Sequence, residues 1–129
     1  MESSERTDRC QLALNAMTCD AFPGLLEWVA KALDERRGKG AVEYMNVLLM
    51  LSDPVADAVH VIAYAGRDEY RAGNPYAPHA VGTEFSEWWD YLSMENECYV
   101  RGQIAEKVPL PDYIRKGAYM FGIGNEVGA

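Results

Sequence analysis

Apolar residues recur at helical spacing along most of this chain. The clearest stretch begins beside Pro23, where positions i, i+3, i+4, i+7 and i+11 are all apolar, namely Phe22, Leu25, Leu26, Val29 and Leu33. This spacing predicts an amphipathic helix with Pro23 in its first turn, because proline fits the start of a helix. Gly38 and Gly40 follow as breakers, so we expect the helix to end there.

Two further segments on either side are also predicted to be helical. Ser3 or Ser4 is suited to cap a first helix that runs to about Cys19 and carries apolar residues at helical spacing. Residues 41–53 are almost wholly apolar, and their length and lack of alternation favour a buried helix over a strand.

Prolines divide the middle of the chain. A long helix is expected to begin near Asp53, with Pro54 in its first turn. Residues 74–82 are predicted to form a loop, because Pro75 and Pro78 exclude the residue before each of them from the α region.

The sequence pattern in the last third of the chain predicts one long helix and one short helix. The long helix covers residues 84–108 and ends at Pro109 and Pro111, and the short one covers about residues 112–122. Together these patterns predict an all-α fold, in which residues 1–129 form a compact single-domain bundle of five to six helices.

Aromatic and acidic side chains separate along the predicted helix after residue 84. At about 100° per residue, one side gathers large apolar side chains, namely Phe85, Trp88, Trp89, Leu92, Tyr99 and Val100. The other side gathers carboxylates, with a tyrosine and two sulfur-containing side chains among them: Glu84, Glu87, Asp90, Tyr91, Met94, Glu95, Glu97 and Cys98.

This acidic face has no local counter-charge, since no Lys or Arg occurs between Ala72 and Val100. The sequence therefore predicts a partner-binding surface composed of Glu84, Glu87, Asp90, Tyr91, Met94, Glu95 and Glu97. A solvated outer face of an ordinary bundle helix is the alternative interpretation.

The charge balance indicates which kind of partner such a face suits. The chain has 20 Asp and Glu against 12 Lys and Arg, a formal net charge of −8, which disfavours direct binding to DNA or RNA. An acidic surface suits a basic partner, such as the nucleic-acid-binding groove of another protein. Acidity for solubility alone is the other interpretation.

Cysteine and histidine are too few and too scattered for common ligand patterns. Three cysteines without a Cys-x-x-Cys spacing, and two histidines, predict no metal site, no cofactor and no disulfide framework. The charged first twenty residues lack a signal-peptide pattern, and the longest apolar run is too short to cross a bilayer. We therefore expect a soluble protein of the reducing cytoplasm.

The segment between two predicted helices forms a Pro-Tyr corner. Pro75 fixes the exit from the first helix, Tyr76 is placed to pack under the next, and Trp88 or Trp89 would close the small core. Residues 63–96 resemble the small helix–loop–helix domain of the ribosome modulation factor family. The elements of the resemblance are Gly66, Tyr70, Gly73, Asn74, Pro75, Tyr76 and Trp88.

The resemblance implies a ribosome- or RNA-associated role under stress. That family is basic, whereas this segment is acidic from Gly73 onward, and Asp90 and Tyr91 stand where small residues are usual. We therefore expect the fold of the corner to carry over and the contact with ribosomal RNA not to.

Catalytic patterns are sparse. The glycines at positions 38–40 and 122–128 fit neither a phosphate-binding loop nor a dinucleotide fingerprint. Asp57 and His60 stand i, i+3 on one helix and have the spacing of an acid–base pair. Since His60 lies between two valines, a partly buried, hydrogen-bonded histidine is the alternative.

Three functions follow from these observations. The first is a non-enzymatic binding protein, such as an anti-CRISPR-like inhibitor from a phage or mobile element that mimics nucleic acid and blocks a host nucleic-acid-binding complex. The second is a ribosome-associated stress regulator, and the third is a small enzyme that uses His60. Trp28 lies off the main apolar face of its helix, so a homodimer is also an open interpretation.

Overall fold

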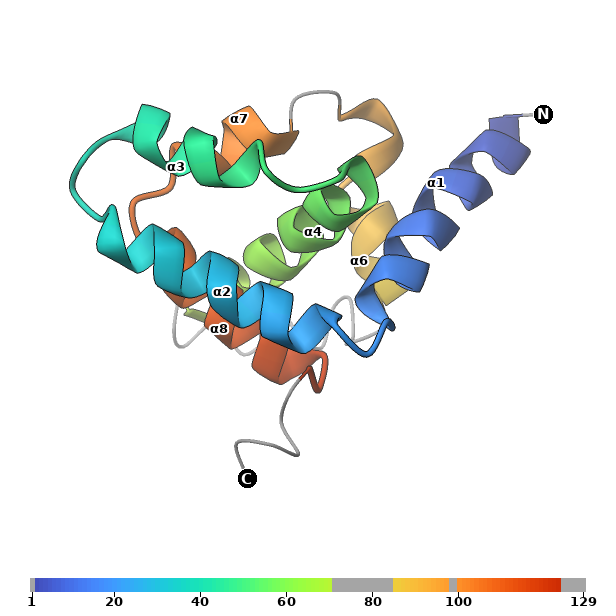
Figure 1. Ribbon diagram of the computed structural model, residues 1–129. Helices are drawn as coiled ribbons and strands as arrows, with labels where there is room; N and C mark the ends of the chain where they lie inside the picture. Colours follow the sequence, from blue (N-terminus) through green and yellow to red (C-terminus); the bar gives the residue numbers. More distant parts are fainter. Residues whose placement is uncertain (1, 71–84, 98–99, 124–129) are drawn as a thin grey trace.

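The computed structural model describes residues 2–70, 85–97 and 100–123, which form seven α-helices and one 3₁₀ turn (Figure 1). These elements are α1 (Glu2–Met17), α2 (Phe22–Glu35), α3 (Ala41–Leu48), α4 (Asp53–Tyr70), α6 (Phe85–Tyr91), η1 (Met94–Asn96), α7 (Val100–Ala105) and α8 (Leu110–Met120). The all-α prediction is confirmed, although the helices number seven rather than five to six. The predicted loop over residues 74–82, with Asn74, Pro75 and Tyr76, lies outside the described residues.

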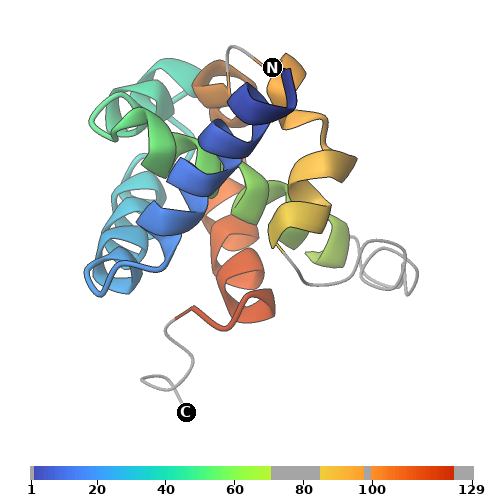
Figure 2. The ribbon, with the colours of Figure 1, turned by 90° about the vertical axis from the view of Figure 1, so that its right-hand side faces the viewer.

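Helix α4 is the centre of the molecule (Figures 1 and 2). It packs most extensively on α8, and it also contacts α1, α6 and α7. Every side chain from Ala56 to Ala63 is buried, which is typical of a helix surrounded by other helices. The start of this helix at Asp53 agrees with the prediction. None of the helices in the described ranges is long and apolar enough to span a bilayer.

Two glycines bring the backbones of α4 and α8 into direct contact. A Cβ atom added to Gly66 would lie 1.8 Å from the carbonyl oxygen of Tyr113, and one added to Gly117 would lie 1.9 Å from that of Ile62. Both distances are far below a van der Waals contact. Glycine inside a helix destabilises it by about 1 kcal/mol relative to alanine. Here the absence of a side chain at both glycines permits the close approach of the two central helices.

Helix α2 follows the sequence pattern closely. Phe22, Leu26, Val29 and Leu33 are buried as predicted. The turn after the helix uses Gly38 and Gly40, whose φ angles of 85° and 101° are positive, a conformation that glycine adopts without steric cost.

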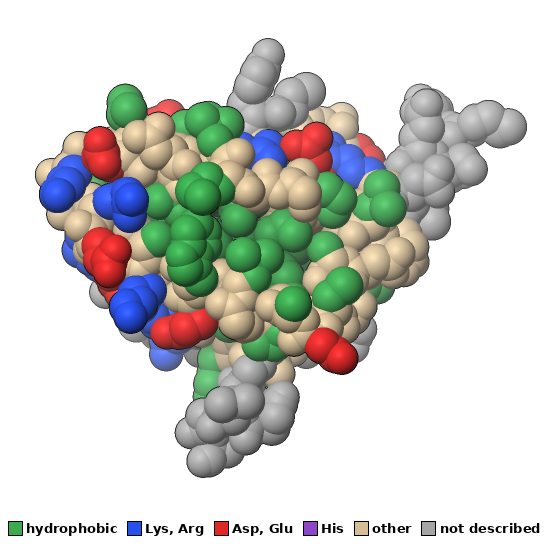
Figure 3. All heavy atoms as spheres, viewed as in Figure 1, with side chains coloured by type: hydrophobic (Ala, Val, Ile, Leu, Met, Phe, Trp, Pro, Cys, Tyr) green, Lys and Arg blue, Asp and Glu red, His purple; other side chains and the backbone are tan. Residues whose placement is uncertain are grey.

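Helix α3 is less buried than its sequence predicts. The helix ends at Leu48, and the side chains of Val42, Leu49 and Met50 are 72%, 60% and 71% exposed. The expectation of a helix buried over residues 41–53 is therefore wrong for one side of this segment, because only the opposite side packs against the core. Figure 3 shows hydrophobic side chains gathered over the middle of the face that α2 and α3 present to the viewer.

The prediction of one continuous helix over residues 84–108 is wrong. Helix α6 ends at Tyr91, and Ser93 adopts a left-handed conformation with a φ angle of 54°. The turn η1 follows, and helix α7 begins only at Val100. Residues 87–97 therefore do not share one helical face.

A side chain from α1 explains this break. The guanidinium of Arg9 donates hydrogen bonds to the backbone carbonyls of Met94 at 2.7 Å and Glu97 at 3.0 Å. A continuous helix would use these carbonyls for its own N–H groups four residues later. In the turn, the Met94 carbonyl accepts from the N–H of Glu97 at 3.0 Å and from Arg9, and the Glu97 carbonyl accepts from Arg9. Arg9 thus supports the turn by supplying donors to two carbonyls that no longer serve a continuous helix.

Candidate partner-binding surface

Three of the predicted surface residues lie exposed together on α6, namely Glu87, Asp90 and Tyr91, which we call the α6 face. The tyrosine side chain is 59% exposed. Beneath it, Trp88 is fully buried, and the two rings meet edge-on, with centroids 5.5 Å apart and an angle of 83° between the ring planes. This contact orients an exposed aromatic ring on the same helix face as two exposed carboxylates.

The second tryptophan of α6, next to Trp88, connects this helix with the turn that follows it. Trp89 is 1% exposed, and its indole N–H donates to the carboxylate of Glu95. The guanidinium of Arg9 lies 5.4 Å from the centre of the Trp89 ring, which is within the range of a cation–π contact. Glu95 is therefore directed toward the protein rather than toward a partner.

Arg9, whose side chain is 32% exposed, also forms an ion pair with the buried Asp57 of α4. Its Nε donates to Oδ2 of Asp57 at 2.9 Å, and its Nη2 donates to Oδ1 at 3.0 Å. Asp57 is only 6% exposed, so its charge depends on this two-point contact. Arg9 thus joins α1, α4 and the turn around η1 through one side chain.

The remaining predicted surface residues do not form an exposed row for a partner. Met94 is fully buried in the core, because the chain turns inward after α6. Glu97 is half-buried, and its carboxylate accepts a hydrogen bond from the side-chain amide of Gln103. Glu84 lies outside the described residues. The acidic row expected over residues 84–97 is therefore reduced to the compact α6 face.

The position of His60 agrees with the buried alternative. His60 is 2% exposed, and its Nδ1 lies 3.3 Å from the carbonyl oxygen of Val100. The ring of Tyr64 packs against it at a tilt of 46°, with the ring centroids 4.7 Å apart. Burial disfavours the imidazolium and lowers the pKa of His60 to about 4. Because the carboxylate of Asp57 binds Arg9, the described geometry gives His60 no accessible acid–base partner.

We expect this burial to make stability depend on pH between about 6.5 and about 4. In that window the unfolded chain binds a proton that the buried ring excludes, so the free energy of unfolding falls as the pH decreases. The complete shift corresponds to about 3 kcal/mol. Urea unfolding of the wild type and His60→Gln at pH values across this window measures the effect. The wild type should lose stability more steeply, and parallel curves for the two proteins would contradict the assignment.

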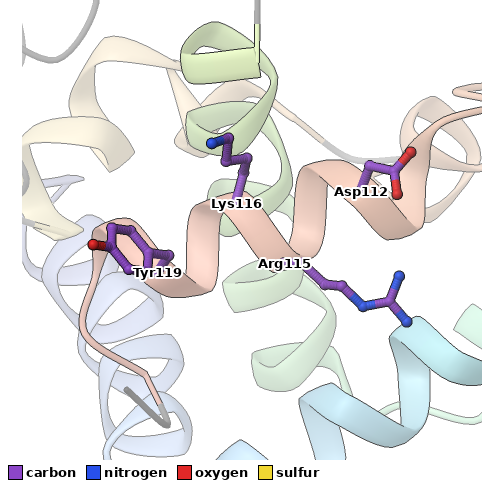
Figure 4. Close-up of a pocket in the computed structure, with 4 residues that line it drawn as sticks. All are labelled: Asp112, Arg115, Lys116 and Tyr119. Atoms are coloured by element: carbon purple, nitrogen blue, oxygen red, sulfur yellow. The ribbon is translucent and has the colours of Figure 1, made fainter. Parts of the chain in front are cut away.

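A shallow hollow of about 680 Å³ over α8 does not form a converging site. Its lining residues are Asp112, Arg115, Lys116 and Tyr119. Figure 4 shows that their side chains diverge, with Arg115 extending toward α2. Arg115 donates to Asp34 at 2.5 Å, and this hydrogen bond is the largest influence lowering the pKa of Asp34. The cation is thus engaged within the protein rather than offered to a ligand.

Neither comparison with known proteins nor metal-ligand geometry indicates a function for this surface. Comparisons with family models, with curated proteins and with solved structures found no match. Among the described residues, no three His, Cys, Asp or Glu side chains are grouped so that they could hold a metal ion.

Proposed function

We propose that this protein is a small non-enzymatic binding protein that docks its α6 face on a basic surface of another protein. The observation that carries the proposal is the exposed ring of Tyr91, held edge-on by the buried Trp88. Glu87 and Asp90 are exposed beside it. An oriented aromatic anchor is typical of the residues that dominate binding energy at protein interfaces, and neighbouring carboxylates select a basic partner.

The charge of the whole chain supports the same class of partner. At a net charge of −8, association with a basic surface is accelerated by long-range attraction and weakens as salt is added. The nucleic-acid-binding groove of a host protein or ribonucleoprotein complex is such a surface. A protein that occupies this groove blocks the binding of nucleic acid and so acts as an inhibitor. This is the role we propose for the present protein, as the product of a phage or mobile element. The α6 face supports a compact contact rather than a long imitation of a phosphate row.

The proposal predicts that reversing two charges removes binding. The double variant Glu87→Lys/Asp90→Lys should lose about tenfold or more in affinity, because both carboxylates flank the anchor ring. The bait for photo-crosslinking is the otherwise wild-type chain with Tyr91→benzoylphenylalanine, which keeps an aromatic ring at the anchor position. The prey is the heparin-retained protein fraction of the native host. Crosslinked partners are identified by mass spectrometry, and their affinity for each variant is then measured.

A matched control separates the α6 face from net charge. Asp20→Lys/Glu106→Lys changes two exposed carboxylates elsewhere and gives the same net charge as the test variant, −8 plus 4, or −4. This control should retain most of the binding. Equal affinity of both double variants would reject the α6 face as the contact surface.

The ribosome-associated alternative depends on the resemblance over residues 63–96. Its corner residues Asn74, Pro75 and Tyr76 lie outside the part of the chain that the structure describes, so this alternative stays a prediction. Sedimentation with ribosomes at low salt tests it directly. Absence of the protein from the ribosomal fraction under those conditions rejects this function and leaves the α6 proposal untouched.

A further inference from the structure

A second surface of different character lies on α2 and α3. Figure 2 shows these two helices on the opposite side of the molecule from α6. Four large apolar side chains on this side are between 42% and 72% exposed. They come from α2, from α3 and from the turn after α3, and we call them the apolar patch: Trp28, Val42, Leu49 and Met50. In Figure 3, hydrophobic side chains on this face adjoin Lys, Arg, Asp and Glu side chains at its left edge.

The patch residues belong to two helices that are joined at their junction. Arg36 and Glu43 form an ion pair of 3.9 Å between the end of α2 and the first turns of α3. Trp28 lies eight residues before Arg36, about 12 Å along the axis of α2, and Met50 lies two residues after the end of α3. Both therefore belong to the α2–α3 side of the molecule (Figure 2).

The patch belongs to an electrically neutral part of an acidic protein. Residues 22–52 contain four basic side chains, Lys31, Arg36, Arg37 and Lys39, and four acidic ones, Glu27, Asp34, Glu35 and Glu43. The rest of the chain holds the other 16 of 20 acidic and 8 of 12 basic residues, and therefore carries the whole net charge of −8. This face differs from the rest of the molecule in both hydrophobicity and charge.

We infer that the apolar patch is the interface of a homodimer. Two copies, each with a charge of −8, repel each other through their acidic surfaces, and the neutral face avoids that repulsion. Around a two-fold axis the same patch meets itself, and Lys31 of one copy can approach Glu27 or Glu35 of the other. A stable interface takes about 800 Å² from each copy, roughly a ninth of the 7302 Å² of accessible surface.

The salt dependence of this dimer distinguishes it from the α6 contact. Raising the salt from about 0.05 M to about 0.5 M screens the repulsion between two acidic copies, so dimerisation should strengthen. Binding of a basic partner to the α6 face should weaken under the same change. The two proposals can therefore fail or succeed independently.

Analytical ultracentrifugation over a micromolar to submillimolar series tests the dimer. Trp28→Gln/Met50→Gln leaves the net charge unchanged and should raise the dissociation constant about tenfold or more, equivalent to at least about 1.4 kcal/mol. The matched control is Leu12→Gln/Tyr91→Gln, which changes two side chains that are 55% and 59% exposed on α1 and α6; it should dimerise like the wild type. A wild type that stays monomeric throughout, or equal weakening by both double variants, overturns the inference.

Tryptophan fluorescence gives a second measurement on the unmodified protein. The chain has three tryptophans, and Trp88 and Trp89 are 0% and 1% exposed, whereas Trp28 is 42% exposed. Quenching by acrylamide therefore reports mainly on Trp28, and it should decrease as the protein is concentrated into dimers. A dimer whose formation leaves this quenching unchanged uses another face, which also overturns the inference.

Discussion

Gly66→Ala and Gly117→Ala should each lower the free energy of unfolding by about 3 kcal/mol. The added methyl group would stand 1.8 Å or 1.9 Å from a backbone carbonyl oxygen of the facing helix. A backbone atom has no alternative rotamer, so α4 and α8 must move apart along the most extensive helix contact in the fold. Urea unfolding followed by circular dichroism measures the loss.

The matched controls are two glycines in open surroundings. Gly24 and Gly102 lie in α2 and α7, and an added Cβ meets no atom within 4 Å. Alanine at these positions should stabilise the protein by up to about 1 kcal/mol, because it favours the helix and restricts the unfolded chain. Destabilisation at all four positions, or at none, would contradict the close-contact explanation for the α4–α8 pair.

Arg9→Met should destabilise the protein by about 2 to 3 kcal/mol. The substitution leaves Asp57, at 6% exposed, as a buried charge without its guanidinium partner. It also removes the donor to the carbonyl oxygens of Met94 and Glu97, so part of the loss arises at the turn after α6. Chemical denaturation at neutral pH measures the change.

Two variants identify the source of this loss. Arg9→Met/Asp57→Leu removes both charges of the pair and should be more stable than Arg9→Met alone, because no unpaired charge remains buried. Arg115→Met breaks an ion pair in which the carboxylate side chain, Asp34, is 34% exposed, whereas the Asp57 side chain is 9% exposed; the two arginines are similar, at 41% and 32%. It should cost no more than about 1 kcal/mol. Equal losses for Arg9→Met and Arg115→Met would argue against a special role for the buried pair.

The sequence predicts the fold well where neighbouring residues decide it. The buried face of α2 and the start of α4 at Asp53 follow from spacing and from proline position alone. The exposed side of α3 was missed, because an apolar run does not reveal which of its residues a neighbouring element covers. The crossing of α4 and α8 was missed as well, since Gly66 and Gly117 become close only in three dimensions.

The candidate site shows the same limit. Glu87, Asp90 and Tyr91 share α6, and helical spacing placed them together. The absence of basic residues between positions 72 and 100 suggested that the carboxylates had no counter-charge. A cation does reach this region from Arg9, but it donates to the backbone carbonyls of Met94 and Glu97, 85 and 88 residues away in the sequence, and its ion pair is with Asp57. A charge at that separation cannot be assigned to a site from local spacing.

The long separation between Arg9 and its acceptors has a consequence for biosynthesis. Arg9 is translated well before its acceptors, because Met94 and Glu97 follow it by 85 and 88 residues. The turn after α6 therefore gains this side-chain support only after the central helix α4 has been made. A nascent chain stalled before Met94 lacks both backbone acceptors of Arg9, so we expect this part of the native structure to form only after residues 94–97 have left the ribosome.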